Sequence, residues 1–139
     1  MGQITLALIW GDDHSMLLLT QYLCHEHGYA LQYYTTFEAA RELWKLTLPA
    51  VAIIKRSLSV TDDGLDFCAA LRSDELTSRL PVIIGWADMS GQTFAEAYQV
   101  GANGCFGRVF DISGVFRMVE LLADDPIRTG LVDQGAALD

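Results

Sequence analysis

Five short apolar runs, separated by segments with helical periodicity, constrain this chain more than any other feature of its sequence. The runs cover residues 4–10, 30–34, 50–54, 82–84 and 105–106. The first and third runs do not alternate apolar with polar residues, which is typical of strands buried on both faces. Strands that alternate with helices of about 10 to 15 residues form βαβ units. The sequence therefore predicts an α/β domain with a parallel sheet between two layers of helices.

Turn and capping residues mark the ends of the five predicted helices. Gly28 and Gly101 are expected to end helices, and Gly64 is expected to open one. The candidate N-caps are Asp13 or Ser15, Thr35 or Thr36, Asp63, and Asp111 or Ser113. The side chains expected in the core include Leu17, Leu18, Trp44 and Phe116. The histidines, which we expect to be solvated near helix ends, are His14, His25 and His27.

The net charge of −9, from 9 basic and 18 acidic residues, restricts the partners of the chain. An acidic surface repels phosphate backbones and anionic membranes, so nucleic-acid and membrane binding are not expected. No apolar run reaches the ~18 to 20 residues of a membrane helix. No basic segment precedes the first apolar run, so a signal peptide is not indicated either. These features predict a cytoplasmic protein.

The chain contains three cysteines, Cys24, Cys68 and Cys105, at wide spacings. An odd number without a CxxC pair or a Cys/His cluster indicates neither a disulfide framework nor a zinc site. Nothing resembles a glycine-rich phosphate loop. We therefore expect free thiols, no metal and no cofactor.

The predicted domain covers residues 1–123, and residues 124–139 differ from it. Pro126 and Gly130 interrupt any helix there, and four aspartates outnumber Arg128. We expect an acidic tail with loose order, or the start of a linker to a further domain.

Five motifs in order resemble the receiver domain of response regulators of the chemotaxis-protein type. They are residues 8–13 (LIWGDD), 48–55 (LPAVAIIK), 63–68 (DGLDFC), 81–87 (PVIIGWA) and 101–110 (GANGCFGRVF). The resemblance extends from about residue 4 to residue 122. It implies a flavodoxin-like, doubly wound sheet of five parallel strands in the order 2-1-3-4-5, with five helices. Such sheets bind ligands beyond the carboxyl ends of their strands.

The resemblance also places the phosphoacceptor pocket, and the residues there depart from the family. Receiver domains use two acidic residues to hold Mg²⁺, an aspartate that takes the phosphoryl group, a hydroxyl residue and a lysine. Lys55 stands at the phosphoacceptor position, Trp86 at the hydroxyl position and Arg108 at the lysine position. The acidic pair is reduced to Asp12, with Asp13 beside it. An ammonium cannot form an acyl phosphate and repels Mg²⁺, so we interpret the chain as a pseudo-receiver without metal or catalysis.

The roles of the pocket residues stay open at this point. The Lys55 ammonium either lies among Asp12 and Asp13, in place of the metal, or is solvated while its stem is buried. Trp86 either closes the pocket, contacts a partner or fills core space. Arg108 is either a surface residue or part of an anion site with Lys55.

A signalling module that acts by protein–protein interaction is the function that these observations favour. It would bind a partner in a two-component pathway, or a second copy of itself, and it would not be an enzyme. The resemblance implies that the face formed by the fourth helix, fifth strand and fifth helix mediates this contact. Its expected residues are Phe94, Tyr98, Cys105, Phe106 and Phe116. The alternatives are a receiver with an unusual phosphoacceptor, for which Asp62 or Asp63 is the nearest candidate, and a flavodoxin-like domain that binds a small molecule.

Overall fold

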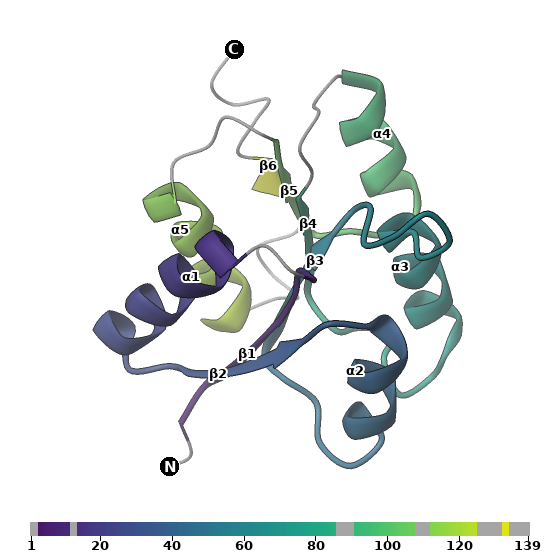
Figure 1. Ribbon diagram of the computed structural model, residues 1–139. Coiled ribbons are helices and arrows are strands. Elements are labelled where there is room, and N and C mark those ends of the chain that lie inside the picture. Colours follow the sequence, from purple (N-terminus) through teal and green to yellow (C-terminus); the bar gives the residue numbers. More distant parts are fainter. Residues whose placement is uncertain (1–2, 12–13, 86–90, 108–111, 125–131, 134–139) are drawn as a thin grey trace.

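The computed structural model describes residues 3–11, 14–85, 91–107, 112–124 and 132–133 (Figure 1). The strands are β1 (Thr5–Ile9), β2 (Ala30–Tyr34), β3 (Val51–Lys55), β4 (Val82–Gly85), β5 (Gly104–Phe106) and β6 (Val132–Asp133). The helices are α1 (His14–His27), α2 (Phe37–Trp44), α3 (Gly64–Ser73), α4 (Gly91–Gln99) and α5 (Ile112–Asp124).

The strands form one sheet in the order β2-β1-β3-β4-β5-β6, and every neighbouring pair is parallel. The predicted order of the first five strands is confirmed. β6 is an addition, since it lies in the segment expected to be a tail and pairs with the outer edge of β5. Two residues are too few to produce a periodic signal, so no pattern in the sequence indicates this strand.

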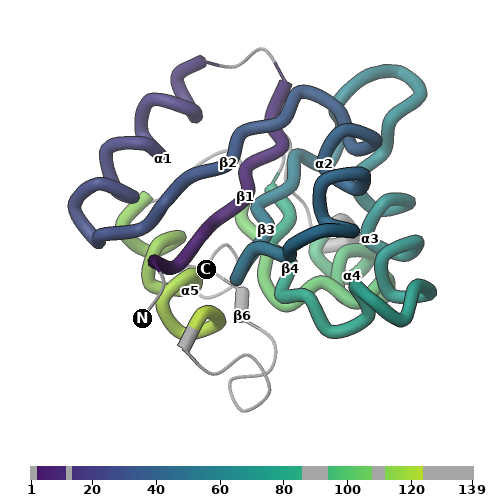
Figure 2. Tube along the Cα trace, turned by 90° about the horizontal axis from the view of Figure 1, so that it is seen from below, coloured from purple at the N-terminus to yellow at the C-terminus, as the bar shows by residue number. Residues whose placement is uncertain are grey.

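Helices cover both faces of the sheet. α1 and α5 lie on one face, and α2, α3 and α4 lie on the other (Figures 1 and 2). Successive strand residues enter the two layers in turn, because side chains alternate across a strand. Leu6, Leu8 and Ile53 pack under α1 and α5, whereas Ile9 and Ile54 pack under α2, α3 and α4. Both layers need apolar residues, and this is why the strands show no alternation.

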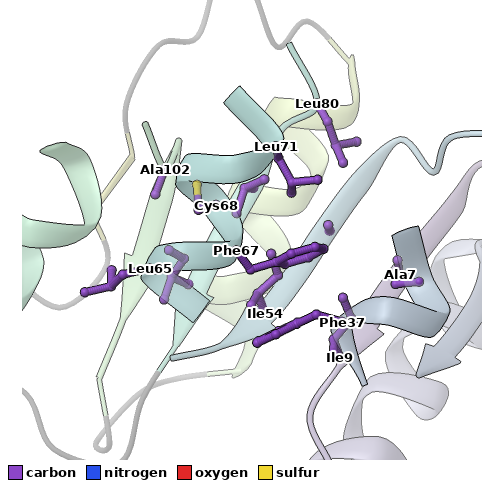
Figure 3. Close-up of a cluster of buried hydrophobic side chains, with 14 of the residues drawn as sticks. Ala7, Ile9, Phe37, Ile54, Leu65, Phe67, Cys68, Leu71, Leu80 and Ala102 are labelled. Atoms are coloured by element: carbon purple, nitrogen blue, oxygen red, sulfur yellow. The ribbon is translucent and has the colours of Figure 1, made fainter. Parts of the chain in front are cut away.

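The layer under α2, α3 and α4 has an aromatic centre. Phe37 of α2 and Phe67 of α3 are stacked, with ring centroids 4.5 Å apart, and Ile54 of the sheet lies beside them (Figure 3). Trp44 belongs to the same cluster and is 1% exposed, as predicted. This contact holds α2 and α3 side by side over β3.

Several predicted helix ends are confirmed. Thr36 Oγ1 accepts a hydrogen bond from the Ala39 amide at 3.2 Å and caps α2. Gly28 and Gly101 follow α1 and α4 with φ of 74° and 95°, a region that favours glycine. Helix α1 begins at His14, so Ser15 lies in its first turn, and the alternative cap Asp13 lies outside the described residues. Ser113 likewise lies within α5, and Asp111 lies outside the described residues.

The prediction that Leu18 is a core residue is wrong, because its side chain is 65% exposed. Helix α1 buries Met16, Thr20 and Cys24, which recur every four residues and define its inner stripe. Leu18 lies two residues away from that stripe, on another face of the helix. Leucines surround much of this helix, so the sequence alone does not identify the face that packs on the sheet.

His27 is exposed at the end of α1, as the sequence suggests, and it also contacts α5. Its ring stacks near Phe116 and Tyr29, with centroids 5.5 and 5.7 Å away, and its Nδ1 lies 3.6 Å from Glu120 Oε2. Phe116 itself is 1% exposed, as expected for the core. His27 therefore connects the end of α1 to α5.

The three cysteines are free, as expected, and all three are buried. Burial raises the pKa of the Cys24 and Cys68 thiols to about 11. Within the described ranges, the helices are too short or too polar to cross a membrane. The same part of the chain contains no cluster of three metal-binding side chains of the His, Cys, Asp or Glu type.

Candidate functional site

The carboxyl ends of the strands place Lys55 at the centre of one edge of the sheet. Lys55 is the last residue of β3, and Gly85 and Phe106 are the last residues of β4 and β5. Lys55 is in register with Gly85, and Gly85 is in register with Phe106. Trp10 directly follows β1, whose Ile9 is in register with Ile54. The four side-chain positions Trp10, Lys55, Gly85 and Phe106 thus form one row along this edge.

Lys55 is partly buried and follows the alternation of β3. Ile53, two residues before it, packs in the layer under α1 and α5, so Lys55 belongs to the same face of the sheet. No ion pair joins it to another residue in the part of the chain that the structure describes. Asp12, Asp13, Trp86 and Arg108 lie outside the described residues. The pairing of Lys55 with Asp12 or Asp13 therefore stays a prediction.

Gly11 stands just before Asp12, at the first position of the acidic pair in the family resemblance. Its φ of 77° lies in the left-handed region, and a Cβ added there would lie 3.3 Å from Leu58 Cδ1. The hydroxyl of Tyr33 donates a hydrogen bond to the Gly11 carbonyl. The backbone is therefore fixed in a conformation that an aspartate at this position would adopt only with strain.

The loop between β3 and α3 is anchored at both ends beside Lys55. Arg56 Nη1 lies 3.5 Å from Asp63 Oδ2, with each side chain about one third exposed, at 31% and 33%. Asp63 Oδ1 accepts a hydrogen bond from the Leu65 amide at 2.7 Å and caps α3, as predicted. The Gly64 amide donates to the Arg56 carbonyl at 2.6 Å, and a Cβ at Gly64 would lie only 2.6 Å from the Lys55 carbonyl oxygen. Helix α3 therefore begins in direct contact with the end of β3.

Asp62 has a structural role in the same loop. Its carboxylate accepts a hydrogen bond from the Ser59 hydroxyl at 3.0 Å, and its carbonyl accepts one from the Leu58 amide at 3.0 Å. Asp62 is thus a loop residue, and Asp63 is the N-cap residue of α3.

Comparisons with known proteins connect this geometry to one fold. No protein-family model and no curated protein matches the chain. Among solved structures, the chain is similar to a candidate response regulator from Chloroflexus aurantiacus, with a TM-score of 0.79 and 23% identity over 88% of this chain and 99% of that one. It is also similar to the receiver domain of a DNA-binding response regulator from Colwellia psychrerythraea, with a TM-score of 0.78 and 21% identity over 88% of this chain and all (100%) of that one.

A third structure, the receiver domain of a signal-transduction histidine kinase from Syntrophus aciditrophicus, has a TM-score of 0.76 and 18% identity over 90% of this chain and 93% of that one. The chain has the receiver-domain fold. The covered shares show that nearly the whole length of these domains has a counterpart here. At this level of identity, the shared property is the fold.

The predicted interaction face of this receiver fold needs a correction at the level of side chains. Phe94, Cys105, Phe106 and Phe116 are 7%, 0%, 1% and 1% exposed, and they belong to the two core clusters. Tyr98 is partly buried against the cluster under α2, α3 and α4. These side chains are apolar and lie on inward stripes of their elements, so the core takes them up. The role of the surface formed by α4, β5 and α5 itself stays a prediction.

The sequence did not predict a contact between Trp10 and Phe106. Their rings are stacked, with centroids 5.8 Å apart and planes that differ by 4°. We call this pair the aromatic bridge. In the sequence, Trp10 follows one predicted strand and Phe106 ends another. These positions indicate a contact only when the register of the strands is known.

Proposed function

We propose that the chain is a receiver-type signalling module that acts by binding a protein partner and is not phosphorylated. The observation that carries this proposal is Lys55 at the carboxyl end of β3, in the centre of the edge where sheets of this kind bind ligands. In the family resemblance, this position belongs to the aspartate that accepts the phosphoryl group.

The chemistry of an ammonium supports the proposal. Phosphoryl transfer depends on positioning and on neutralising the charge of the phosphoryl oxygens, chiefly by Mg²⁺. A carboxylate at the acceptor position contributes −1 beside the metal and provides the attacking oxygen. Lys55 contributes +1 and has no such oxygen. This change removes the acceptor and disfavours Mg²⁺ at the same time.

The neighbouring residues also support a module without phosphorylation. Gly11 provides no carboxylate, and its left-handed φ disfavours one. The nearest described alternatives as acceptors are already engaged, because Asp63 caps α3 and pairs with Arg56. Asp62 accepts a hydrogen bond within its own loop.

The partner that we propose is a protein of a two-component pathway, or a second copy of this chain. The similar structures include receiver domains of a response regulator and of a histidine kinase, so the fold occurs on both sides of such pathways. We propose the side formed by α4, β5 and α5 as the contact surface, in the cytoplasm.

Incubation with acetyl phosphate and Mg²⁺ tests the proposal directly. The mass of the intact protein should stay unchanged, whereas a receiver that retains its acceptor aspartate should gain a phosphoryl group in the same buffer. Intrinsic tryptophan fluorescence should also stay flat at millimolar Mg²⁺. A stable mass increase, or saturable quenching at lower Mg²⁺, would instead favour a receiver with an unusual acceptor. A thermal shift with nucleotides or flavin would favour the small-molecule alternative.

A further inference from the structure

The aromatic bridge spans two intervening strands. β3 and β4 separate β1 from β5, and neighbouring strands lie about 4.8 Å apart, so the backbones of β1 and β5 are on the order of 14 Å apart. Ring centroids only 5.8 Å apart require both side chains to reach toward each other over the ends of β3 and β4. The bridge thus joins two strands that share no backbone hydrogen bond.

Gly85 provides the space that the bridge occupies. A Cβ added to Gly85 would lie 2.3 Å from Phe106 Cζ and less than 3 Å from both Cε atoms, at 2.6 and 2.7 Å. Gly85 is not among the glycines with positive φ, so its backbone does not require glycine. The reason for glycine here is that the Phe106 ring fills the place of its side chain.

The bridge is enclosed in the core. Trp10 is 6% exposed and Phe106 is 1% exposed, and both belong to the cluster under α1 and α5. A displacement of β5 along β4 would move the Phe106 ring out of the space above Gly85 and away from Trp10. Because close-packed interiors change between discrete arrangements and do not deform continuously, a ring held on two sides favours one arrangement.

We propose that the aromatic bridge is a conformational lock that holds the end of β5 in one position, so that the side formed by α4, β5 and α5 presents a constant surface. This inference rests on the proposed function, because a module that is not phosphorylated must offer its binding surface without a phosphorylation-driven switch. Gly85 and the two rings of the bridge are the parts of this lock.

A double-mutant cycle tests the geometry of the lock. Gly85→Ala should lower the urea midpoint strongly in the wild type, because the new methyl group collides with the Phe106 ring. In a Phe106→Val background, the same substitution should cost much less, because the ring is gone. Gly64→Ala is the matched control, since its Cβ collides with the Lys55 carbonyl oxygen, and Phe106→Val should not relieve it. An equal cost of Gly85→Ala in both backgrounds would overturn the proposal.

Backbone dynamics test the function of the lock. In the wild type, ¹⁵N relaxation dispersion should detect no microsecond-to-millisecond exchange at Gly104–Phe106. Phe106→Val should introduce exchange there and accelerate amide hydrogen exchange of β5. Trp10→Leu provides the same measurement if Phe106→Val does not fold. Exchange at β5 in the wild type, or unchanged dynamics in the variants, would contradict the lock.

These results and the phosphorylation test can fail independently. A mass increase with acetyl phosphate would contradict the proposed function. The coupling between Gly85 and Phe106 would still test the geometry of the lock. If the stability effects of Gly85→Ala and Phe106→Val are additive and the mass stays unchanged, the lock is contradicted. The proposal of an unphosphorylated module would then still stand.

Discussion

At the scale of single residues, the chemistry of the site depends most on Lys55. It is the last residue of β3 and is partly buried. It lies in one row with Trp10, Gly85 and Phe106. A charge at such a position either has a partner or extends its ammonium to water. Within the described residues no ion pair is formed by Lys55, and its pairing with Asp12 or Asp13 stays a prediction from the sequence.

We predict that Lys55 and Asp12 are energetically coupled. Removal of one partner of a fully buried pair costs about 3 to 5 kcal/mol, and the partial exposure of Lys55 reduces this to about 1 to 2 kcal/mol. Lys55→Ala and Asp12→Ala should each lower the free energy of unfolding, and the double variant should lose less than the sum. Urea denaturation of the four proteins measures the coupling.

The matched control for this cycle is Lys45→Ala. Lys45 Nζ lies 2.6 Å from Glu42 Oε2, but the two side chains are 64% and 65% exposed. An exposed pair contributes little, so this variant should leave stability nearly unchanged. Lys55→Asp should be less stable than Lys55→Ala without metal, because it adds a carboxylate, and Mg²⁺ should partly restore it. If Lys55→Ala is as stable as the wild type and shows no coupling, Lys55 is solvated and does not replace the metal.

At the scale of elements, Arg72 joins α3 to the turn between α4 and β5. Its Nε donates to the Gly101 carbonyl at 2.9 Å, and its Nη2 donates to Asn103 Oδ1 at 2.9 Å. Its Nη1 lies 3.3 Å from the carbonyls of Thr77 and Ser78. Burial lowers the pKa of this guanidinium. The planar fork of arginine satisfies these acceptors together, and no carboxylate is involved among these contacts.

We predict that Arg72→Lys destabilises the protein by about 2 to 3 kcal/mol, because lysine leaves buried carbonyl acceptors unsatisfied. The free energy of unfolding in urea measures this effect. Arg41→Lys is the control, since Arg41 forms a half-exposed ion pair with Asp74 at 3.3 Å and should tolerate the change. Equal effects of the two substitutions would show that the arginine network does not hold these elements together.

At the scale of the whole molecule, both layers of the core contain a buried thiol. Cys24 lies in the layer under α1 and α5, and Cys68 lies in the layer under α2, α3 and α4. Desolvation raises the pKa of each from 9.0 to about 11. The folded chain therefore keeps these protons at a pH where the unfolded chain loses them.

We predict that stability falls as the pH rises from about 9 to about 11, because the unfolded state then binds fewer protons than the folded state. Burial also raises the pKa of Tyr34, which adds to the fall in the upper part of this range. Urea denaturation at several alkaline pH values measures the slope. The variant with Cys24→Ala and Cys68→Ala should show a shallower fall, and an identical slope would refute the assignment to these thiols.

The sequence by itself determined the fold and the central residue of the candidate site. Strands and helix ends depend on residues that are close together in the sequence, so local patterns predict them. Examples are the non-alternating strands, the caps Thr36 and Asp63, and Gly28. The order of the five strands came from the resemblance to receiver domains. Lys55 followed from its place at the end of a strand.

Only the tertiary structure decided which faces are buried and which side chains meet across strands. Leu18 is exposed because α1 packs through another stripe, and Phe106 is buried because Gly85 leaves it space. The aromatic bridge and the contacts of Arg72 join residues far apart in the chain. Such contacts depend on strand register and on helix rotation about its axis, and neither property is encoded in a local pattern of residue types.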